Sequence, residues 1–401
     1  MKKYILFKSI LFLLLSYNFV YADWSHSTGI NTSFVYTFTA SSNKIFTGTH
    51  NHGVYYSADN GITWVQTELN SHTVLSLIAQ GNYLYAGTNG SGIYRSFDEG
   101  AIWEPTALNN WSIYSLAVNG NNLFAGSSSF GIYKSTNNGR SWITCLYNQT
   151  AKSLANAGSN IFAGTVNNGV FTSGNNGSIW TQTTLNNRSI ISLDIRGNNI
   201  YAGTNGYGIY KSSDSGSNWT HTVFNNQTIT SIYIQGNNIF AGAINDGVYI
   251  STNNGTNWTQ KNEGLPDIVD IYSLFVSNNN LIAGTKDFGV WYRSISDIIG
   301  VKNISNEVPE KFQLFQNYPN PFNPVTKIKF DVQQEVRNQS LEVRIVIYDI
   351  LGKEIATLVN EQLKPGTYEV EWNAADYPSG IYYYKLITDG FSETKKLVLQ
   401  K

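Results

Sequence analysis

Two aspartates in corresponding loops are the candidates for acid–base chemistry. Asp246 directly precedes a glycine, and Asp287 lies two residues before one. A pair of carboxylates held ~5 to 10 Å apart can hydrolyse a glycosidic bond, so these two residues are catalytic candidates if the fold brings them together. Solvated loop carboxylates are the alternative interpretation. His50 and His52 offer two imidazoles without a third ligand, so neither a metal site nor a cofactor is predicted.

A second group of residues has the composition of a binding surface. Segments of the type Leu-Asn-Asn-x-Ser/Thr carry a different residue at x in each copy, including His72, Trp111, Arg188 and Gln227. A second kind of loop varies in the same way and contributes His52, Phe130, Tyr207 and Phe288. Aromatic rings offer flat apolar area and the polar groups offer hydrogen bonds, so this set is predicted to bind a polysaccharide or a protein segment. Ordinary variation of exposed loops is the alternative.

Internal repeats must position both groups. An aromatic residue or Ile, then Ala or Thr, then Gly recurs, the glycines being Gly48, Gly87, Gly126, Gly164, Gly203, Gly242 and Gly284. Each unit of about 40 residues holds short apolar runs separated by Asn-Gly and similar turns. Four short antiparallel strands per unit indicate the blade of a β-propeller, with a solenoid as the alternative architecture.

The ends of the repeat region favour a closed ring of seven blades. Six units lead into a turn followed by Trp, whereas the seventh breaks off after Ser294 without one. The segment beginning at Trp24 resembles the strand beginning at Trp219, so we expect it to complete the last blade. A closed ring leaves no open sheet edge between its ends. In this ring the variable segments meet on one face and the Asn-Gly turns on the other.

The turn before each Trp resembles the Asp-box, Ser-x-Asp-x-Gly-x-x-Trp, of sialidase-like propellers. Its third position is occupied by Asp59, Asp98, Asn137, Asn175, Asp214 and Asn253. Asp and Asn both accept hydrogen bonds from the backbone of a turn, so these residues are predicted to be structural. Sialidases hold a substrate carboxylate with three arginines. Only one arginine of the repeat region, Arg188, maps to the variable face, so a sialidase site is not expected. Other Asp-box propellers cleave polysaccharides with paired carboxylates, which leaves Asp246 and Asp287 as the enzymatic alternative.

The last quarter of the chain has another character. It contains Tyr318-Pro319-Asn320-Pro321-Phe322, then Tyr348-Asp349-Ile350-Leu351-Gly352-Lys353, and then Pro378-Ser379-Gly380-Ile381-Tyr382. Alternating apolar runs between these motifs predict an immunoglobulin-like β-sandwich. The motifs closely resemble the type A C-terminal sorting domain of type IX secretion substrates. This resemblance implies recognition by the type IX secretion machinery and a secreted or outer-membrane surface-attached, extracellular protein.

The N-terminus and the charge distribution complete the domain organisation. Lys2 and Lys3 precede an apolar run that ends near Ala22, as in a cleaved signal peptide. Residues 23–296 hold 24 Asp, Glu, Lys and Arg, against 26 in the shorter 297–401. We therefore expect a signal peptide (1–22), a propeller (23–296), a linker (297–309) and a sorting domain (310–401).

The composition of the chain limits the classes of partner that are expected. The net charge of −1 offers no basic field for nucleic acid, and the single cysteine, Cys145, cannot form an intrachain disulfide. Membrane association is expected only through secretion or surface attachment. The favoured function is a secreted or cell-surface binding module. A polysaccharide-cleaving enzyme and a structural propeller without a small ligand are the alternatives.

Overall fold

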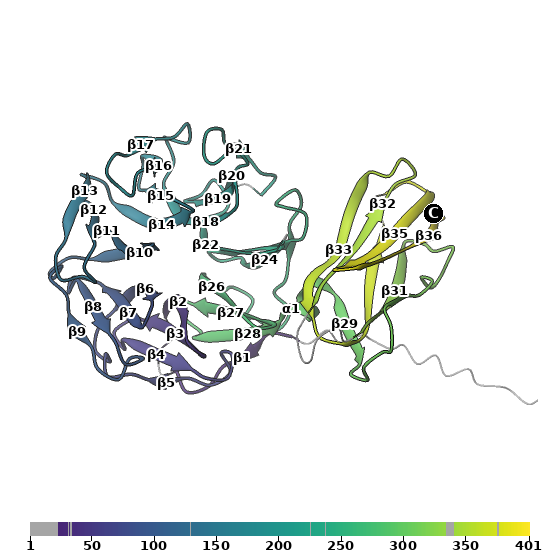
Figure 1. The fold of residues 1–401 in the computed structure, drawn as a ribbon, viewed down its shortest axis with the longest axis horizontal. Helices are drawn as coiled ribbons and strands as arrows, with labels where there is room; N and C mark the ends of the chain where they lie inside the picture. The colour runs from purple at the N-terminus through teal and green to yellow at the C-terminus, as the bar shows by residue number, and fades with distance from the viewer. Residues whose placement is uncertain are drawn as a thin grey trace, which may run out of the picture.

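A computed structural model describes residues 23–401, apart from residues 31, 33, 129, 225, 237, 334–340 and 375–376. The predicted signal peptide, residues 1–22, lies outside the described residues. The described chain is almost entirely β-structure, and the predicted all-β class is confirmed. It forms a ring of small sheets followed by a two-layered sandwich (Figure 1). No helix in the described part has the length and hydropathy needed to cross a membrane.

The ring consists of seven four-stranded antiparallel sheets within the described residues. From the inner strand outward, the first three sheets are β2–β5 (Val35–Ser41, Lys44–Thr49, Val54–Ser57, Val65–Gln66), β6–β9 (Val74–Gln80, Tyr83–Thr88, Ile93–Ser96, Glu104–Pro105) and β10–β13 (Ile113–Asn119, Asn122–Ser127, Gly131–Ser135, Ile143–Tyr147). The next three are β14–β17 (Ala151–Ala157, Asn160–Thr165, Gly169–Ser173, Thr181–Gln182), β18–β21 (Ile190–Arg196, Asn199–Thr204, Ile209–Ser212, Thr220–His221) and β22–β25 (Ile229–Gln235, Asn238–Ala243, Gly247–Ser251, Thr259–Gln260). The last contains β26 (Ile271–Ser277), β27 (Asn280–Thr285), β28 (Val290–Ser294) and β1 (Ser25–His26).

The repeated aromatic-Ala-Gly motif builds the core between neighbouring sheets. Phe46 on β3 is fully buried and packs with Val74 and Leu84 of the next sheet. A Cβ atom on Gly48 would lie 2.6 Å from the Val74 side chain, so glycine permits the close approach of the next inner strand. The repeat therefore encodes contact between blades as well as the strand itself.

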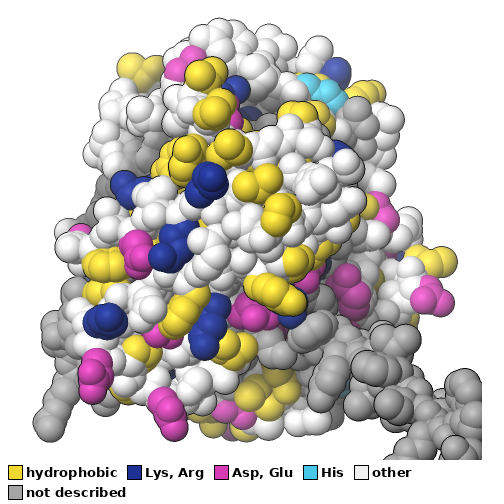
Figure 2. All heavy atoms as spheres, turned by 90° about the vertical axis from the view of Figure 1, so that its right-hand side faces the viewer, with side chains coloured by type: hydrophobic (Ala, Val, Ile, Leu, Met, Phe, Trp, Pro, Cys, Tyr) yellow, Lys and Arg dark blue, Asp and Glu magenta, His cyan; other side chains and the backbone are white. Residues whose placement is uncertain are grey.

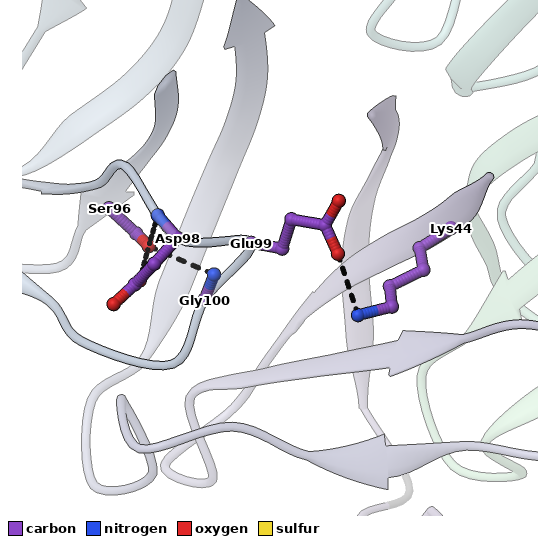
Figure 3. Close-up of polar contacts among 5 residues, drawn as sticks. All are labelled: Lys44, Ser96, Asp98, Glu99 and Gly100. Atoms are coloured by element: carbon purple, nitrogen blue, oxygen red, sulfur yellow. Dashed lines mark hydrogen bonds and ion pairs between the residues drawn. The ribbon is translucent and has the colours of Figure 1, made fainter. Parts of the chain in front are cut away.

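The Asp-box-like turns are held by their own side chains (Figure 3). In the second sheet, Ser96 Oγ donates to Asp98 Oδ1 at 2.8 Å and accepts from the Gly100 N–H at 2.9 Å. The backbone N–H of Ile102, 2.9 Å from Asp98 Oδ1, lowers the pKa of this carboxyl. Glu99 in the same turn makes an ion pair of 2.8 Å with Lys44 of the neighbouring sheet.

The five other predicted Asp-box residues occupy the same place. Each side-chain oxygen accepts from the backbone N–H four residues later, at Asp59, Asn137, Asn175, Asp214 and Asn253. Because Asn provides the same acceptor as Asp, both residue types close the turn.

The N-terminal strand closes the ring as predicted. Ser25 and His26 of β1 pair with Tyr292 and Trp291 of β28. Trp24, 3% exposed, donates from Nε1 to the Lys261 carbonyl at 2.7 Å. At the centre, β2 of the first sheet packs against β26 of the last. Residues from both ends of the repeat region thus form one sheet.

A short helix connects the ring to the C-terminal sandwich. In α1 (Ile295–Ile299), Ile295 and Ile298 are buried in the core of the last propeller sheet, and Ile299 also packs on the sandwich core. Within the segment predicted as a linker, β29 (Val301–Ser305) pairs with β34 of the sandwich. These five residues are therefore part of a sheet, because their backbone completes its edge.

The sandwich has two four-stranded antiparallel sheets within the described residues, with strand orders β29-β34-β31-β30 and β33-β32-β35-β36. The strands are β30 (Gln313–Leu314), β31 (Val325–Val332), β32 (Leu341–Tyr348), β33 (Glu354–Leu363), β34 (Gly366–Asn373), β35 (Gly380–Thr388) and β36 (Phe391–Leu399). Their alternating apolar residues meet in one core, which includes Phe330, Ile345 and Tyr384.

Candidate functional site

Backbone hydrogen bonds place the two kinds of variable loop on one face of the ring. The residue at x accepts, through its carbonyl, from a glycine of the variable loop in the preceding blade. These bonds are 2.8 to 2.9 Å long and join Gly53 to His72, Gly92 to Trp111, Gly169 to Arg188 and Gly208 to Gln227. Each x residue therefore lies beside the loop of the blade before it.

The side chains at x instead contact the loop of their own blade. The rings of Trp111 and Phe130 are 4.0 Å apart, centroid to centroid. The Arg188 guanidinium carbon lies 4.2 Å from the centre of the Tyr207 ring. Gln227 Nε2 donates to Asp246 Oδ2 at 2.6 Å. The third, fifth and sixth sheets thus carry a pair of variable residues in the same place.

A tyrosine of the third strand contacts variable residues in three blades. Tyr94 Oη lies 3.1 Å from His72 Nε2, and Arg188 Nε donates to Tyr210 Oη at 3.3 Å. Tyr249 Oη donates to Asp246 Oδ2 at 2.7 Å. An aromatic residue recurs at this position, two residues after a loop glycine, so the repeat is also visible in the sequence.

The remaining predicted ligand contacts lie on the same loops. His52 Nδ1 is 2.9 Å from the His50 carbonyl. The Phe288 carbonyl accepts from Trp291 Nε1 at 3.0 Å, and Phe288 is 40% exposed.

Asp246, one of the two catalytic candidates, is held by neighbouring side chains. Both carboxylate oxygens of Asp246 accept hydrogen bonds, from Gln227, Tyr249 and Gln260. No hydrogen bond or ion pair between described residues joins Asp246 to Asp287. Among the described residues, no cluster of three or more His, Cys, Asp or Glu side chains could hold a metal ion.

β-Bulges in the inner strands single out a set of residues that were not predicted from the sequence. Every inner strand shifts register after its first residue, and the skipped residues are Tyr36, Leu75, Tyr114, Lys152, Ile191, Thr230 and Tyr272. A bulge re-aims the side chain of its extra residue and is common near functional sites. The sequence signal is a variable residue between the first, buried apolar residue of the inner strand and a Ser or Thr.

An aromatic cluster forms where the first and last inner strands meet. Phe34 stacks on Tyr36 at 4.2 Å between ring centroids and meets Tyr272 edge-on at 4.7 Å. Tyr36 Oη lies 3.4 Å from His50 Nδ1. Burial raises the pKa of Tyr272, and the negative charges of Asp270 and Asp287 raise it further. This aromatic cluster is at the variable-loop face, because its tyrosines begin the inner strands.

A buried asparagine holds the first sorting motif of the sandwich in place. Asn317, 2% exposed, donates from Nδ2 to Thr326 Oγ1 at 2.9 Å and to the Pro319 carbonyl at 3.1 Å. Its backbone N–H donates to Tyr384 Oη at 2.8 Å. Tyr318 is 80% exposed, and the bonds preceding Pro319 and Pro321 are cis.

The other motif residues also lie at turns or strand ends. Asn320 Oδ1 accepts from the Val398 N–H at 2.9 Å. Gly352 has φ +80° in a turn whose Asp349 accepts from the N–H groups of Leu351 and Lys353. Gly380 begins β35.

The sandwich coincides with a recognised domain. Residues 316–400 match the secretion system C-terminal sorting domain. The chain therefore carries a sorting domain. This domain indicates export by the type IX pathway and a secreted or cell-surface location. It also implies interaction with the type IX secretion machinery.

The ring has its own similarities. Residues 149–287 match the DUF6242 beta propeller domain. YCF48 from Cyanidioschyzon merolae is 16% identical, with a TM-score of 0.56 over 69% of this chain and 100% of that one. The WD40 beta propeller domain of Doa1 is 14% identical, with a TM-score of 0.52 over 67% of this chain and 96% of that one. The computationally designed Ika8 protein is 11% identical, with a TM-score of 0.52 over 67% and 98%. These similarities show the fold alone, and no curated protein matches the sequence.

Proposed function

We propose that this exported protein is a binding module whose propeller holds a polysaccharide on the variable-loop face. The observation that carries the proposal is the repeated pairing of x residues with loop residues, above all Trp111 with Phe130 and Arg188 with Tyr207. The pairs lie on a rigid ring, which is the usual arrangement for binding residues on loops.

The exposed rings favour a sugar chain. Phe130 is 46% exposed and Tyr207 is 49% exposed, although each is packed on one neighbour. An aromatic ring fixed in this way offers a flat apolar surface to a sugar ring, and the nearby Arg and Gln side chains supply hydrogen bonds. The state of Asp246 favours binding over cleavage, because neighbouring donors already occupy its carboxylate oxygens.

Export is proposed to use the exposed apolar surface of the sorting domain. Figure 2 shows apolar side chains among Lys and Arg on that side of the molecule. Leu351 is 90% exposed and Ile350 is 68% exposed, at one turn. An apolar turn with this exposure suits contact with another protein.

A polysaccharide panel tests the proposal when retention and cleavage are measured together on the purified protein. We expect retention of at least one polysaccharide and loss of that retention in Phe130→Ala. Phe97→Ala is the matched control, because Phe97 is 55% exposed and lies in an Asp-box-like turn. Retention that Phe130→Ala leaves unchanged, or no retention at all, contradicts the proposal. New reducing ends that disappear in Asp246→Asn would instead support the enzymatic alternative.

A further inference from the structure

Two adjoining cavities lie on the face opposite the variable loops. They have volumes of about 520 and 550 Å³ and share Arg196, Gly197 and Asn198. Arg196 is the last residue of the inner strand β18, whose first residue, Ile190, follows the variable segment. Seven residues of strand separate the two ends by roughly 20 Å. The cavities are therefore distinct from the proposed polysaccharide face.

Arg196 is a cation without a partner among the described residues. No hydrogen bond or ion pair engages its guanidinium there, and the residue is exposed. A Cβ atom on Gly236 would lie 3.4 Å from Arg196 Nη1 and 3.3 Å from Asn360 Nδ2. The guanidinium and the side-chain amide of Asn360, on β33, thus both lie close to Gly236, beside the Asn360 carbonyl oxygen. Two such donors suit a carboxylate or another oxyanion.

A second cation stands beside the smaller cavity. Lys211 Nζ donates to the Asn254 carbonyl at 3.0 Å and lies 5.5 Å from the centre of the Tyr201 ring. Asn254 and Tyr201 both line this cavity. The neighbouring turn carries Asn253 where three of the other turns carry Asp, so this turn adds no negative charge.

The lining of both cavities combines polar and apolar side chains, and no carboxylate is among the lining residues. Besides Arg196, the polar lining side chains are mainly amides, from Asn156, Asn160, Asn198, Asn199 and Asn254. Asp194, on the same strand as Arg196, is turned to the backbone N–H groups of Ile195 and Ile234, at 2.8 and 2.7 Å. Amides can hydrogen-bond to sugar hydroxyls, and the cations select an acidic sugar.

We propose that these cavities form a second site, which binds an acidic polysaccharide through the carboxylates of its uronate residues. Arg196 holds a carboxylate between the two cavities, and the asparagines bind the hydroxyls of the adjoining sugars. Each cavity has the volume of a small-molecule site, and their contact along the Arg196 turn suits an extended chain.

Trigalacturonate and its methyl ester provide a matched pair of probes, because esterification removes the charge and retains the sugar chain. Titration calorimetry on the purified protein at low salt is expected to show binding of the acid and weaker binding of the ester. Arg196→Gln should weaken binding of the acid about 10- to 100-fold, as expected for loss of a charged hydrogen bond. Arg140→Gln, the same charge change at an exposed turn residue outside the cavities, should leave it unchanged.

Three outcomes overturn the second site: no binding of trigalacturonate, equal binding of the ester, or unchanged binding by Arg196→Gln. Binding that Phe130→Ala abolishes and Arg196→Gln spares also overturns it, and supports the proposed function on the other face. Because the two variants lie on opposite faces, failure of one proposal is distinguishable from failure of the other.

Discussion

Lys152 Nζ lies 3.3 Å from the centre of the Tyr114 ring, across the junction of the third and fourth propeller sheets. Both residues are the bulged residues of their inner strands, so the same backbone irregularity aims one side chain at the other. Burial lowers the pKa of Lys152, and the ring face partly replaces the lost hydration of the ammonium.

Replacing the Tyr114 side chain tests whether its contact with Lys152 stabilises the propeller. Tyr114→Leu should lower the free energy of unfolding by about 1 to 2 kcal/mol, because the cation loses its π partner. Tyr114→Phe keeps the ring and should be close to wild type. Equal urea denaturation midpoints for the two variants would show that the cation–π contact contributes nothing.

Trp24→Ala should be strongly destabilising. Its side chain is buried in the last sheet and holds the strand that closes the ring. Loss of a buried Trp side chain costs about 3 to 5 kcal/mol. The matched change Trp111→Ala, at the partly exposed binding face, should cost much less. Wild-type stability of Trp24→Ala in guanidinium denaturation would rule out a closing role for this segment.

We expect Asp98→Asn to preserve the stability of the protein and Asp98→Ala to reduce it. Asp98→Ala removes the acceptor for the Ile102 N–H and is expected to cost about 1 to 2 kcal/mol, as at a helix N-cap. Asp98→Asn keeps an acceptor oxygen, as Asn137 does in the next turn, and should stay near wild type. Thermal denaturation of the two variants distinguishes these outcomes, and a costly Asn variant would indicate that the charge itself is required.

Asp194 should make stability depend on pH. Burial raises the pKa of Asp194 from 3.8 to about 6, so between these values the folded chain keeps a proton that the unfolded chain has lost. The carboxyl therefore contributes stability that is complete below pH ~4 and is lost as the pH rises through 6, at most about 3 kcal/mol. Relative to wild type, Asp194→Asn should become more stable as the pH rises from 4.5 to 7.5 in urea denaturation. A pH-independent difference between the two proteins would contradict the assignment.

Asn317→Ala should loosen the sorting domain. It removes two hydrogen bonds of a buried amide and leaves Thr326 Oγ1 without one donor, a change of about 1 to 3 kcal/mol. Amide hydrogen exchange should rise across β31 and β35 while the propeller strands stay unchanged. Unchanged exchange in the sandwich would mean that the Tyr318–Pro321 motif is held by other contacts.

Repetition explains how much of this fold could be read from the chain. A motif such as Phe124-Ala125-Gly126 places a buried ring, a small residue and a close backbone approach at fixed spacing, and each copy repeats the prediction. The Trp24 segment was predictable for the same reason, since it supplies a strand that the last copy lacks. The linker prediction did not include β29, because pairing with β34 depends on a partner more than sixty residues away.

The candidate sites, like the fold, were predictable from the sequence only in part. Local sequence determined the strands, the turns, the face on which variable loops meet and the sorting motifs, because these follow from neighbouring residues and a repeated pattern. Tertiary structure alone decided that Trp111 packs on Phe130, that Asp246 is held by Gln227 and that Arg196 lies between two cavities. The first two contacts join separate loops of one blade, and the cavities lie between neighbouring blades, so their geometry depends on how loops and blades pack together.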